Sequence, residues 1–149
     1  MLLSTLLLGA SLAVSAAQPP VREPFDPTRD PQRDVWAAID VARIQHKRIL
    51  LDVCGEWCGW CHVLDRTLAS DRSLSEFVPA HFVVVKVNYS PENSNKDFLS
   101  CFPAIIGYPH LFILDRNGYL LHSQDTEALE SGKGYDAQLI LEFLRRWSE

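Results

Sequence analysis

Ten residues near the middle of the chain read Asp52-Val53-Cys54-Gly55-Glu56-Trp57-Cys58-Gly59-Trp60-Cys61. They continue the apolar run 49–54, which is short and nearly unbroken, as is typical of a strand buried on both faces. The residues Gly55, Glu56 and Trp57 interrupt this run. From Cys58 onward the apolar residues recur at helical spacing. The stretch therefore predicts a strand, a tight turn and a helix that begins at Cys58.

Two cysteines, Cys58 and Cys61, are three residues apart at the start of this predicted helix. The first turn of a helix has unpaired backbone N–H groups and the positive end of the dipole, so it favours an anion there. We therefore expect Cys58 to react as a thiolate and to be the attacking nucleophile. Cys61 lies one turn further in, more shielded from water and close enough to form a disulfide with Cys58. It is expected to resolve a mixed disulfide formed by Cys58.

The rest of the chain alternates between helical and extended patterns. Apolar residues recur at helical spacing in three further segments, 33–46, 73–79 and 136–147. Apolar runs predict further strands at 82–88, 111–114 and 119–121. Asn117-Gly118 between the last two strands predicts a hairpin. Strands separated by helices favour parallel pairing, so the expected fold class is α/β, a mixed sheet with helices on both faces.

From Lys47 to Trp147 the sequence resembles the thioredoxin superfamily, and the ten residues quoted above resemble its active-site region. The resemblance implies a thioredoxin-like fold and a protein-disulfide oxidoreductase whose redox-active disulfide joins Cys58 and Cys61. It implies protein thiols and disulfides, and an unidentified redox partner, as the molecules with which the chain reacts. We expect no cofactor and no metal.

The same resemblance assigns roles to residues outside the cysteine pair. Asp52 matches the buried acid that moves the proton of the inner thiol, and Lys86 matches the lysine near that acid. Tyr108-Pro109 matches the cis-proline position that faces the disulfide. Two simpler interpretations remain open: Asp52 as a purely structural buried acid, and Lys86 as a partly solvated strand residue.

Two features depart from the common thioredoxin pattern. Trp60 stands where most thioredoxins have proline, and the segment 89–107 is longer than in a minimal thioredoxin. The chain more closely resembles the extended, secreted thioredoxin-like proteins with a Trp-Cys-x-x-Cys core, so the direction of electron flow stays open. Trp57, Trp60 and Tyr108 are expected to line a substrate groove, with core packing as the alternative for Trp57.

The remaining cysteines, Cys54 and Cys101, have several possible roles. They could form a second disulfide, remain free thiols, take part in relay exchange, or serve as small buried apolar residues. His62 could favour the Cys58 thiolate from the same helix face or simply face solvent.

Three rival functions use the same stretch of sequence. Cys58-Gly59-Trp60-Cys61-His62 also matches the attachment signature of c-type haem. The second rival is a zinc site built from Cys54, Cys58, Cys61 and His62, although four ligands within nine residues differ from the usual two separated pairs. The third is a redox-inert binding module, against which the presence of both active cysteines argues.

The N-terminal region predicts export. Residues 1–17 contain no charge and a leucine-rich run followed by small residues, as in a secretory signal peptide cleaved after Ala16 or Ala17. An uncleaved anchor is the alternative, but the run is short for a membrane span. Residues 18–32 hold five prolines and are expected to form an extended lead-in to a thioredoxin-like domain at 33–149. The expected location is periplasmic or otherwise secreted.

The composition narrows the choice of partners. The chain has 149 residues, a formal net charge of −5 and scattered basic residues, which argues against nucleic-acid binding. The same acidic balance argues against anionic membrane surfaces, so we expect no stable membrane association after signal cleavage. We expect the mature protein to be a monomer.

Overall fold

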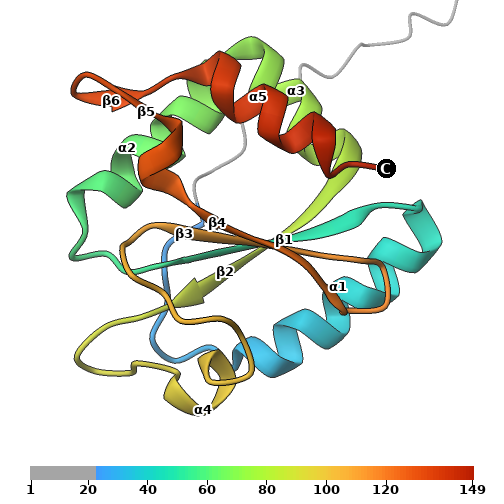
Figure 1. The fold of residues 1–149 in the computed structure, drawn as a ribbon. Helices are drawn as coiled ribbons and strands as arrows, with labels where there is room; N and C mark the ends of the chain where they lie inside the picture. Colours follow the sequence, from blue (N-terminus) through green and yellow to red (C-terminus); the bar gives the residue numbers. More distant parts are fainter. Residues whose placement is uncertain (1–22) are drawn as a thin grey trace, which may run out of the picture.

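A four-stranded mixed sheet forms the centre of the molecule (Figure 1). The computed structural model describes residues 23–149, so the predicted signal peptide and the first part of the proline-rich segment lie outside the described residues. The strands occur in the order β2-β1-β3-β4 and are β1 (Arg48–Cys54), β2 (Phe82–Asn88), β3 (His110–Leu114) and β4 (Leu120–Asp125). β1 pairs in parallel with β2 and antiparallel with β3, and β3 pairs antiparallel with β4. The predicted α/β fold class with a mixed sheet is confirmed.

Helices cover both faces of this sheet (Figure 1). One face carries α2 (Gly59–Ser70), α3 (Arg72–His81) and α5 (Ala137–Arg146), and the other carries α1 (Pro31–Gln45) and the short α4 (Lys96–Leu99). A 3₁₀ helix, η1 (Thr126–Leu129), and a small hairpin of β5 (Glu130–Ser131) and β6 (Gly134–Tyr135) connect β4 to α5. The sequence patterns had not predicted α4, η1 or this small hairpin. No helix within residues 23–149 is long and apolar enough to cross a membrane.

The side chains of β1 alternate between the two faces of the sheet. Ile49, Leu51 and Val53 pack in the core cluster beneath α1. Leu50 packs on the opposite face, among residues of α2, α3 and α5. Because residues two apart on a strand share a face, this alternation places Asp52 and Cys54 on the side covered by α2. The strand therefore places the Asp52 carboxylate and the Cys54 sulfur near the start of that helix.

The predicted Asn117-Gly118 hairpin joins β3 and β4. Gly118 has φ +88°, a backbone conformation that glycine adopts without a steric penalty. The carboxylate of Asp115 accepts hydrogen bonds from the backbone N–H groups of Asn117 and Tyr119. The second strand extends to Asp125, four residues beyond its predicted end at Leu121.

The predicted extended lead-in ends earlier than residue 32. α1 begins at Pro31, because the side chain of Asp30 caps the backbone N–H groups of Gln32 and Arg33. Proline is well suited to the first helical position, where no N–H is needed. The lead-in also packs against the domain, since Phe25 is only 1% exposed.

Candidate active site

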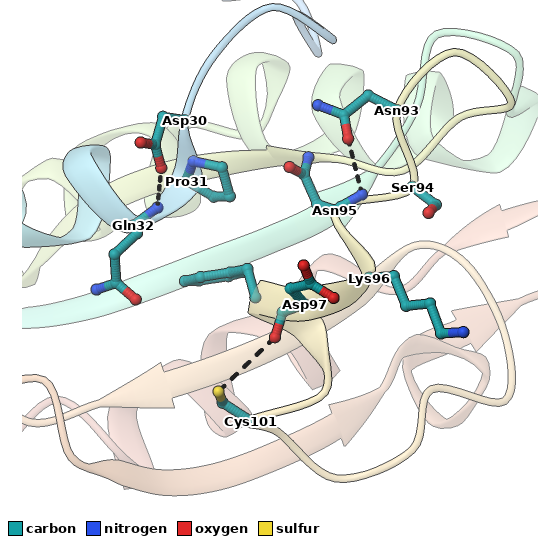
Figure 2. Close-up of a pocket in the computed structure, with 10 residues that line it drawn as sticks. Asp30, Pro31, Gln32, Asn93, Ser94, Asn95, Lys96, Asp97 and Cys101 are labelled. Atoms are coloured by element: carbon teal, nitrogen blue, oxygen red, sulfur yellow. Dashed lines mark hydrogen bonds between the residues drawn. The ribbon is translucent and has the colours of Figure 1, made fainter.

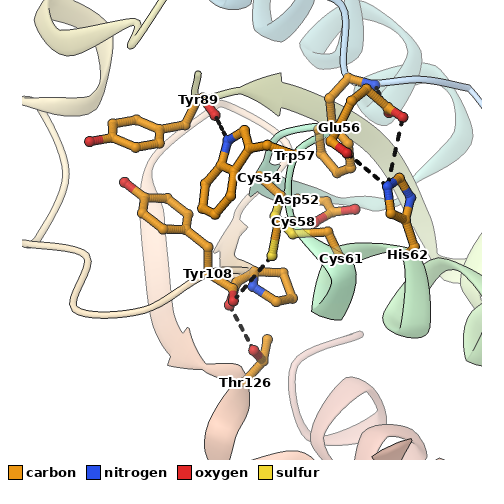
Figure 3. The surroundings of a disulfide bond; sticks show 12 residues. Asp52, Cys54, Glu56, Trp57, Cys58, Cys61, His62, Tyr89, Tyr108 and Thr126 are labelled. Atoms are coloured by element: carbon orange, nitrogen blue, oxygen red, sulfur yellow. Dashed lines mark hydrogen bonds and ion pairs between the residues drawn. A yellow bond between two sulfur atoms is a disulfide. The ribbon is translucent and has the colours of Figure 1, made fainter. Parts of the chain in front are cut away.

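Three of the four cysteines meet at the C-terminal end of β1 (Figure 3). Cys54 is the last residue of β1, Cys58 is the N-cap of α2, and Cys61 lies in the first turn of that helix. Their sulfur atoms all lie within 4.8 Å of one another. Any two of these thiols are therefore close enough to exchange a disulfide after a small movement.

The disulfide present in the structure differs from the predicted one. Cys61 is bonded to Cys54, seven residues earlier, with a Cα–Cα distance of 6.3 Å, and Cys58 is a free thiol. The physical reason is that the strand end brings the Cys54 sulfur within reach of Cys61, in addition to the Cys58 sulfur that the helix supplies. The predicted Cys58–Cys61 pair therefore requires an exchange from the arrangement seen here.

Cys58 occupies the predicted position at the start of the helix but is more covered than expected. Its side chain is 6% exposed, compared with 1% for Cys61. Its sulfur lies 3.7 Å from the carbonyl oxygen of Tyr108, to which the thiol donates. The peptide bond from Tyr108 to Pro109 is cis, as the family resemblance implied, and Pro109 is buried. The thiol and this turn thus face each other across the site (Figure 3).

A buried charge cluster lies on the same face of the sheet. Lys86 of β2 is the direct neighbour of Asp52 on β1, and its ammonium lies 3.3 Å from the Asp52 carboxylate. The same ammonium lies 2.5 Å from the carboxylate of Asp65 on α2, a residue that no sequence pattern indicated. The Lys86 side chain is 12% exposed, so this strand residue keeps a small contact with solvent while its ammonium contacts both carboxylates.

Phe25 closes the site from the N-terminal side. It clusters with Cys54, Cys58 and Cys61, and its backbone N–H donates to the Glu56 carboxylate over 2.8 Å. The ammonium of Lys86 lies 4.1 Å from the centre of the Phe25 ring, a cation–π contact. The lead-in segment therefore excludes water from the cysteines.

Aromatic residues form an exposed surface beside Cys58. Trp57 is 55% exposed, and its indole N–H donates to the carbonyl oxygen of Tyr89 over 2.7 Å. Tyr108 stacks on Tyr89 with ring centres 4.5 Å apart and meets the edge of Trp57 at 6.0 Å. Burial, together with the neighbouring Tyr89, raises the pKa of Tyr108 to about 12, so its hydroxyl stays protonated. Two hollows of about 480 and 540 Å³ border this surface and share Tyr89 and Ser94.

Trp60 does not join this aromatic group. Its ring meets the edge of Tyr135 on β6, with ring centres 5.5 Å apart. The Tyr135 hydroxyl donates to Thr126, whose hydroxyl donates to the carbonyl oxygen of Pro109 over 2.7 Å. Burial raises the pKa of Tyr135 to about 12, so it remains a donor in this chain. The chain of hydrogen bonds fixes the carbonyl of Pro109 from behind.

The fourth cysteine, Cys101, lies in a separate polar pocket of about 530 Å³ (Figure 2). It is an exposed free thiol, and its sulfur lies 3.8 Å from the backbone oxygen of Asp97. The interpretation of Cys101 as a buried apolar residue is therefore wrong, and the alternative of a Cys54–Cys101 disulfide is not the one seen, because Cys54 is bonded to Cys61. For Cys54, burial is confirmed.

The Cys54–Cys61 disulfide does not suit haem attachment, and His62 does not join the three cysteines as the zinc alternative required. Haem attachment would need free sulfurs on both Cys58 and Cys61, whereas Cys61 is bonded to Cys54. A nitrogen of the His62 ring lies 2.9 Å from the carbonyl oxygen of Glu56, which holds the ring against the turn. Within residues 23–149, the cysteine cluster thus brings together three sulfur ligands without His62.

Comparisons with known proteins agree with this architecture. The model of the family described as thioredoxin-like matches residues 30–116. No curated protein matches the sequence. Among solved structures, a disulfide isomerase from Xylella fastidiosa superposes with a TM-score of 0.73 at 23% identity, covering 87% of this chain and 100% of that one.

Two further structures share the fold. A structure described as DsbH oxidoreductase has a TM-score of 0.59 at 18% identity and covers 92% of each chain. The germline-specific thioredoxin Deadhead from Drosophila melanogaster has a TM-score of 0.54 at 21% identity, covering 77% of this chain and 92% of that one. At these identities the structures establish the fold, and the family match extends over more than half of the sequence. The chain belongs to the thioredoxin-like family.

Proposed function

We propose that this chain is a protein-disulfide oxidoreductase in which Cys58 attacks and Cys61 resolves. The observation that carries the proposal is the placement of Cys58. It caps a twelve-residue helix, its sulfur faces the turn at Tyr108 and Pro109, and the Cys61 sulfur lies within 4.8 Å. The start of a helix favours the thiolate that attacks a disulfide.

The reaction consists of two exchanges. The Cys58 thiolate attacks one sulfur of a substrate disulfide, so a Cys58–substrate bond forms and the other substrate sulfur leaves as a thiolate. When the redox partner has reduced the Cys54–Cys61 disulfide by two electrons, the Cys61 thiol loses its proton and attacks the Cys58 sulfur of the mixed disulfide, and the second substrate sulfur leaves as a thiolate. Asp52, buried on the face of β1 that α2 covers, is the proposed acceptor of the Cys61 proton. The ammonium of Lys86 lies 3.3 Å from the Asp52 carboxylate and pairs with it.

The aromatic surface of Trp57, Tyr89 and Tyr108 is the proposed substrate groove. An extended peptide lying across it would place its disulfide over Cys58 and could pair with the backbone of Tyr108 as an added strand. Pro109 contributes by shaping this turn, and its own carbonyl is already held by Thr126. Trp60 belongs to the other side of the site, where it borders Tyr135.

The cellular setting belongs to the same proposal. The pattern of residues 1–17 supports export to the periplasm or beyond, where disulfides persist. There a single domain at 33–149, acting as a monomer, would exchange disulfides with exported proteins and be recycled by a redox partner.

The experiment that tests the function is trapping of a mixed disulfide. The double variant Cys54→Ala/Cys61→Ser removes both thiols that could attack a mixed disulfide at Cys58. It should therefore accumulate a covalent complex with insulin chains that have been reduced and then reoxidised. The matched control, Cys54→Ala/Cys58→Ser, should trap none. Equal trapping by both variants, or failure of the wild type to reduce insulin, would contradict the proposal. Equilibration with glutathione then gives the direction: a potential of about −120 mV is that of an oxidase and about −270 mV that of a reductase.

A further inference from the structure

Cys54 lies within the reacting group rather than beside it. It is fully buried at the end of β1, its sulfur is bonded to Cys61, and the free Cys58 sulfur lies within 4.8 Å of both. Cys61 is thus the shared partner of two thiols, one supplied by the strand and one by the start of the helix. A purely structural disulfide would not hold the residue needed to resolve a mixed disulfide.

We propose that Cys54 is a third redox-active cysteine, which competes with Cys58 for Cys61. The proposal rests on the function proposed above and adds a step to it. The Cys58 thiolate attacks the Cys61 sulfur, the Cys58–Cys61 bond forms as the Cys54–Cys61 bond breaks, and Cys54 leaves as a thiolate that takes up a proton. One disulfide is replaced by another, so the step needs no external oxidant or reductant.

The Cys54–Cys61 and Cys58–Cys61 forms differ in the position and burial of the thiol that stays unpaired. When Cys54 holds Cys61, the unpaired thiol is Cys58, at the helix start where an anion is favoured. When Cys58 holds Cys61, the unpaired thiol is Cys54, which is fully buried at the end of β1. In the Cys54–Cys61 form, Cys58 is therefore free to react, while Cys61, which would resolve a mixed disulfide, is blocked by its bond to Cys54.

The consequence is a protein with two oxidised forms. In the Cys54–Cys61 form, Cys58 can enter a mixed disulfide with a substrate and remain there, which gives the freed substrate thiol time to attack a different sulfur. In the Cys58–Cys61 form, the protein delivers a disulfide in the ordinary way. Cys54 sets the balance between these two reactions.

The test maps which thiol is free in the oxidised protein. The full chain, carrying Cys101→Ser to remove the exposed fourth thiol, is equilibrated with oxidised glutathione, quenched in acid and alkylated with N-ethylmaleimide. Chymotrypsin cleaves after Trp57 and Trp60, so the three cysteines fall on separate peptides for mass spectrometry. The expected result is a population with the label on Cys58 and a Cys54–Cys61 disulfide. A label found only on Cys54 would overturn the proposal.

Kinetics provide the second measurement. In Cys54→Ala the resolving thiol can no longer be withheld, so the lifetime of the Cys58 mixed disulfide should fall severalfold. An unchanged lifetime would overturn the proposal. If neither the wild type nor Cys54→Ala reduces insulin, the oxidoreductase function fails instead, so the two failures can be told apart.

Discussion

The ammonium group of Lys86 lies 3.3 Å from the carboxylate of Asp52, and the two residues are direct neighbours on parallel strands. The same ammonium also contacts Asp65 on α2 and the ring of Phe25. One lysine therefore connects the sheet, the helix that carries the active cysteines and the N-terminal segment that covers them. A charge buried in this way is stable only while its partners remain.

Lys86→Met should destabilise the protein by about 3–5 kcal/mol, because it removes the cation between two largely buried carboxylates. Chemical denaturation at neutral pH measures the loss. Lys96→Met, at an exposed position on α4, is the matched control and should change the free energy of unfolding by less than about 0.5 kcal/mol. Equal effects for the two variants would show that the cluster adds nothing to stability.

Asp52→Asn should slow the resolution of the Cys58 mixed disulfide by about 100-fold, the range of a lost general base. Stopped-flow measurement of release from a preformed mixed disulfide, in protein first reduced at Cys54 and Cys61, gives the rate. Alkaline pH should restore much of the loss, since hydroxide can then take the proton of Cys61. Asp65→Asn is the control, because it touches the same lysine without a proposed role in proton transfer. If Asp52→Asn resolved the mixed disulfide as fast as Asp65→Asn does, the proposed role of Asp52 in proton transfer would be wrong.

Alkylation of the fully reduced protein at mildly acidic pH should label Cys58 before Cys61. Cys58 is at the start of α2 and is the less covered of the two cysteines, so the reagent reaches its sulfur first. Timed iodoacetamide labelling followed by peptide mapping measures the order. Faster labelling of Cys61 would reverse the assigned roles.

Gly55→Ala should displace Trp57 and weaken the substrate groove. A Cβ at residue 55 would collide with the indole of Trp57 and the carbonyl oxygen of Tyr89, which are joined by a hydrogen bond. We expect a loss of about 1–3 kcal/mol in stability and a change in tryptophan fluorescence. Gly59→Ala is the matched control, since a Cβ there meets no atom within 4 Å. If Gly55→Ala were as harmless as this control, the turn would not depend on that glycine.

His110 should make the stability of the fold depend on pH below neutrality. Burial lowers the pKa of His110 from its ordinary value of 6.5, and the neighbouring His122 adds to the effect while Asp125 opposes it. The unfolded chain therefore binds a proton near pH 6.5 that the folded protein takes up only at lower pH. Stability must fall as the pH drops from about 6.5 toward the folded pKa. In His110→Gln, thermal unfolding measured between pH 7.5 and 5.5 should show a shallower dependence than in the wild type, and parallel curves would contradict the assignment.

Local sequence patterns were sufficient to predict the main helices and strands and to place Cys58 and Cys61 at the start of a helix. The apolar run before Gly55 and the helical spacing after Cys58 predicted β1 and α2, because each depends on contacts between residues close in sequence. Asn117-Gly118 predicted its hairpin for the same reason: the turn needs a residue that tolerates positive φ. The buried acid, its lysine and the turn at Pro109 followed from the family resemblance.

The residues that contact the active-site cysteines, Asp52 and Lys86 could be identified only from the tertiary structure. Phe25 lies in a proline-rich segment without periodicity, and nothing local indicates that it reaches the cysteines. Asp65 is one of several acids on a helix until the packing of α2 against the sheet brings it to Lys86. The pairing of Cys54 with Cys61 also could not be predicted from the sequence. These two residues are seven positions apart, one at the end of a strand and one in the first turn of a helix, and the spacing alone does not say whether their sulfur atoms are in contact. Sequence spacing fixes distance along the chain, whereas a disulfide depends on how two elements dock, and that is decided by the core beneath them.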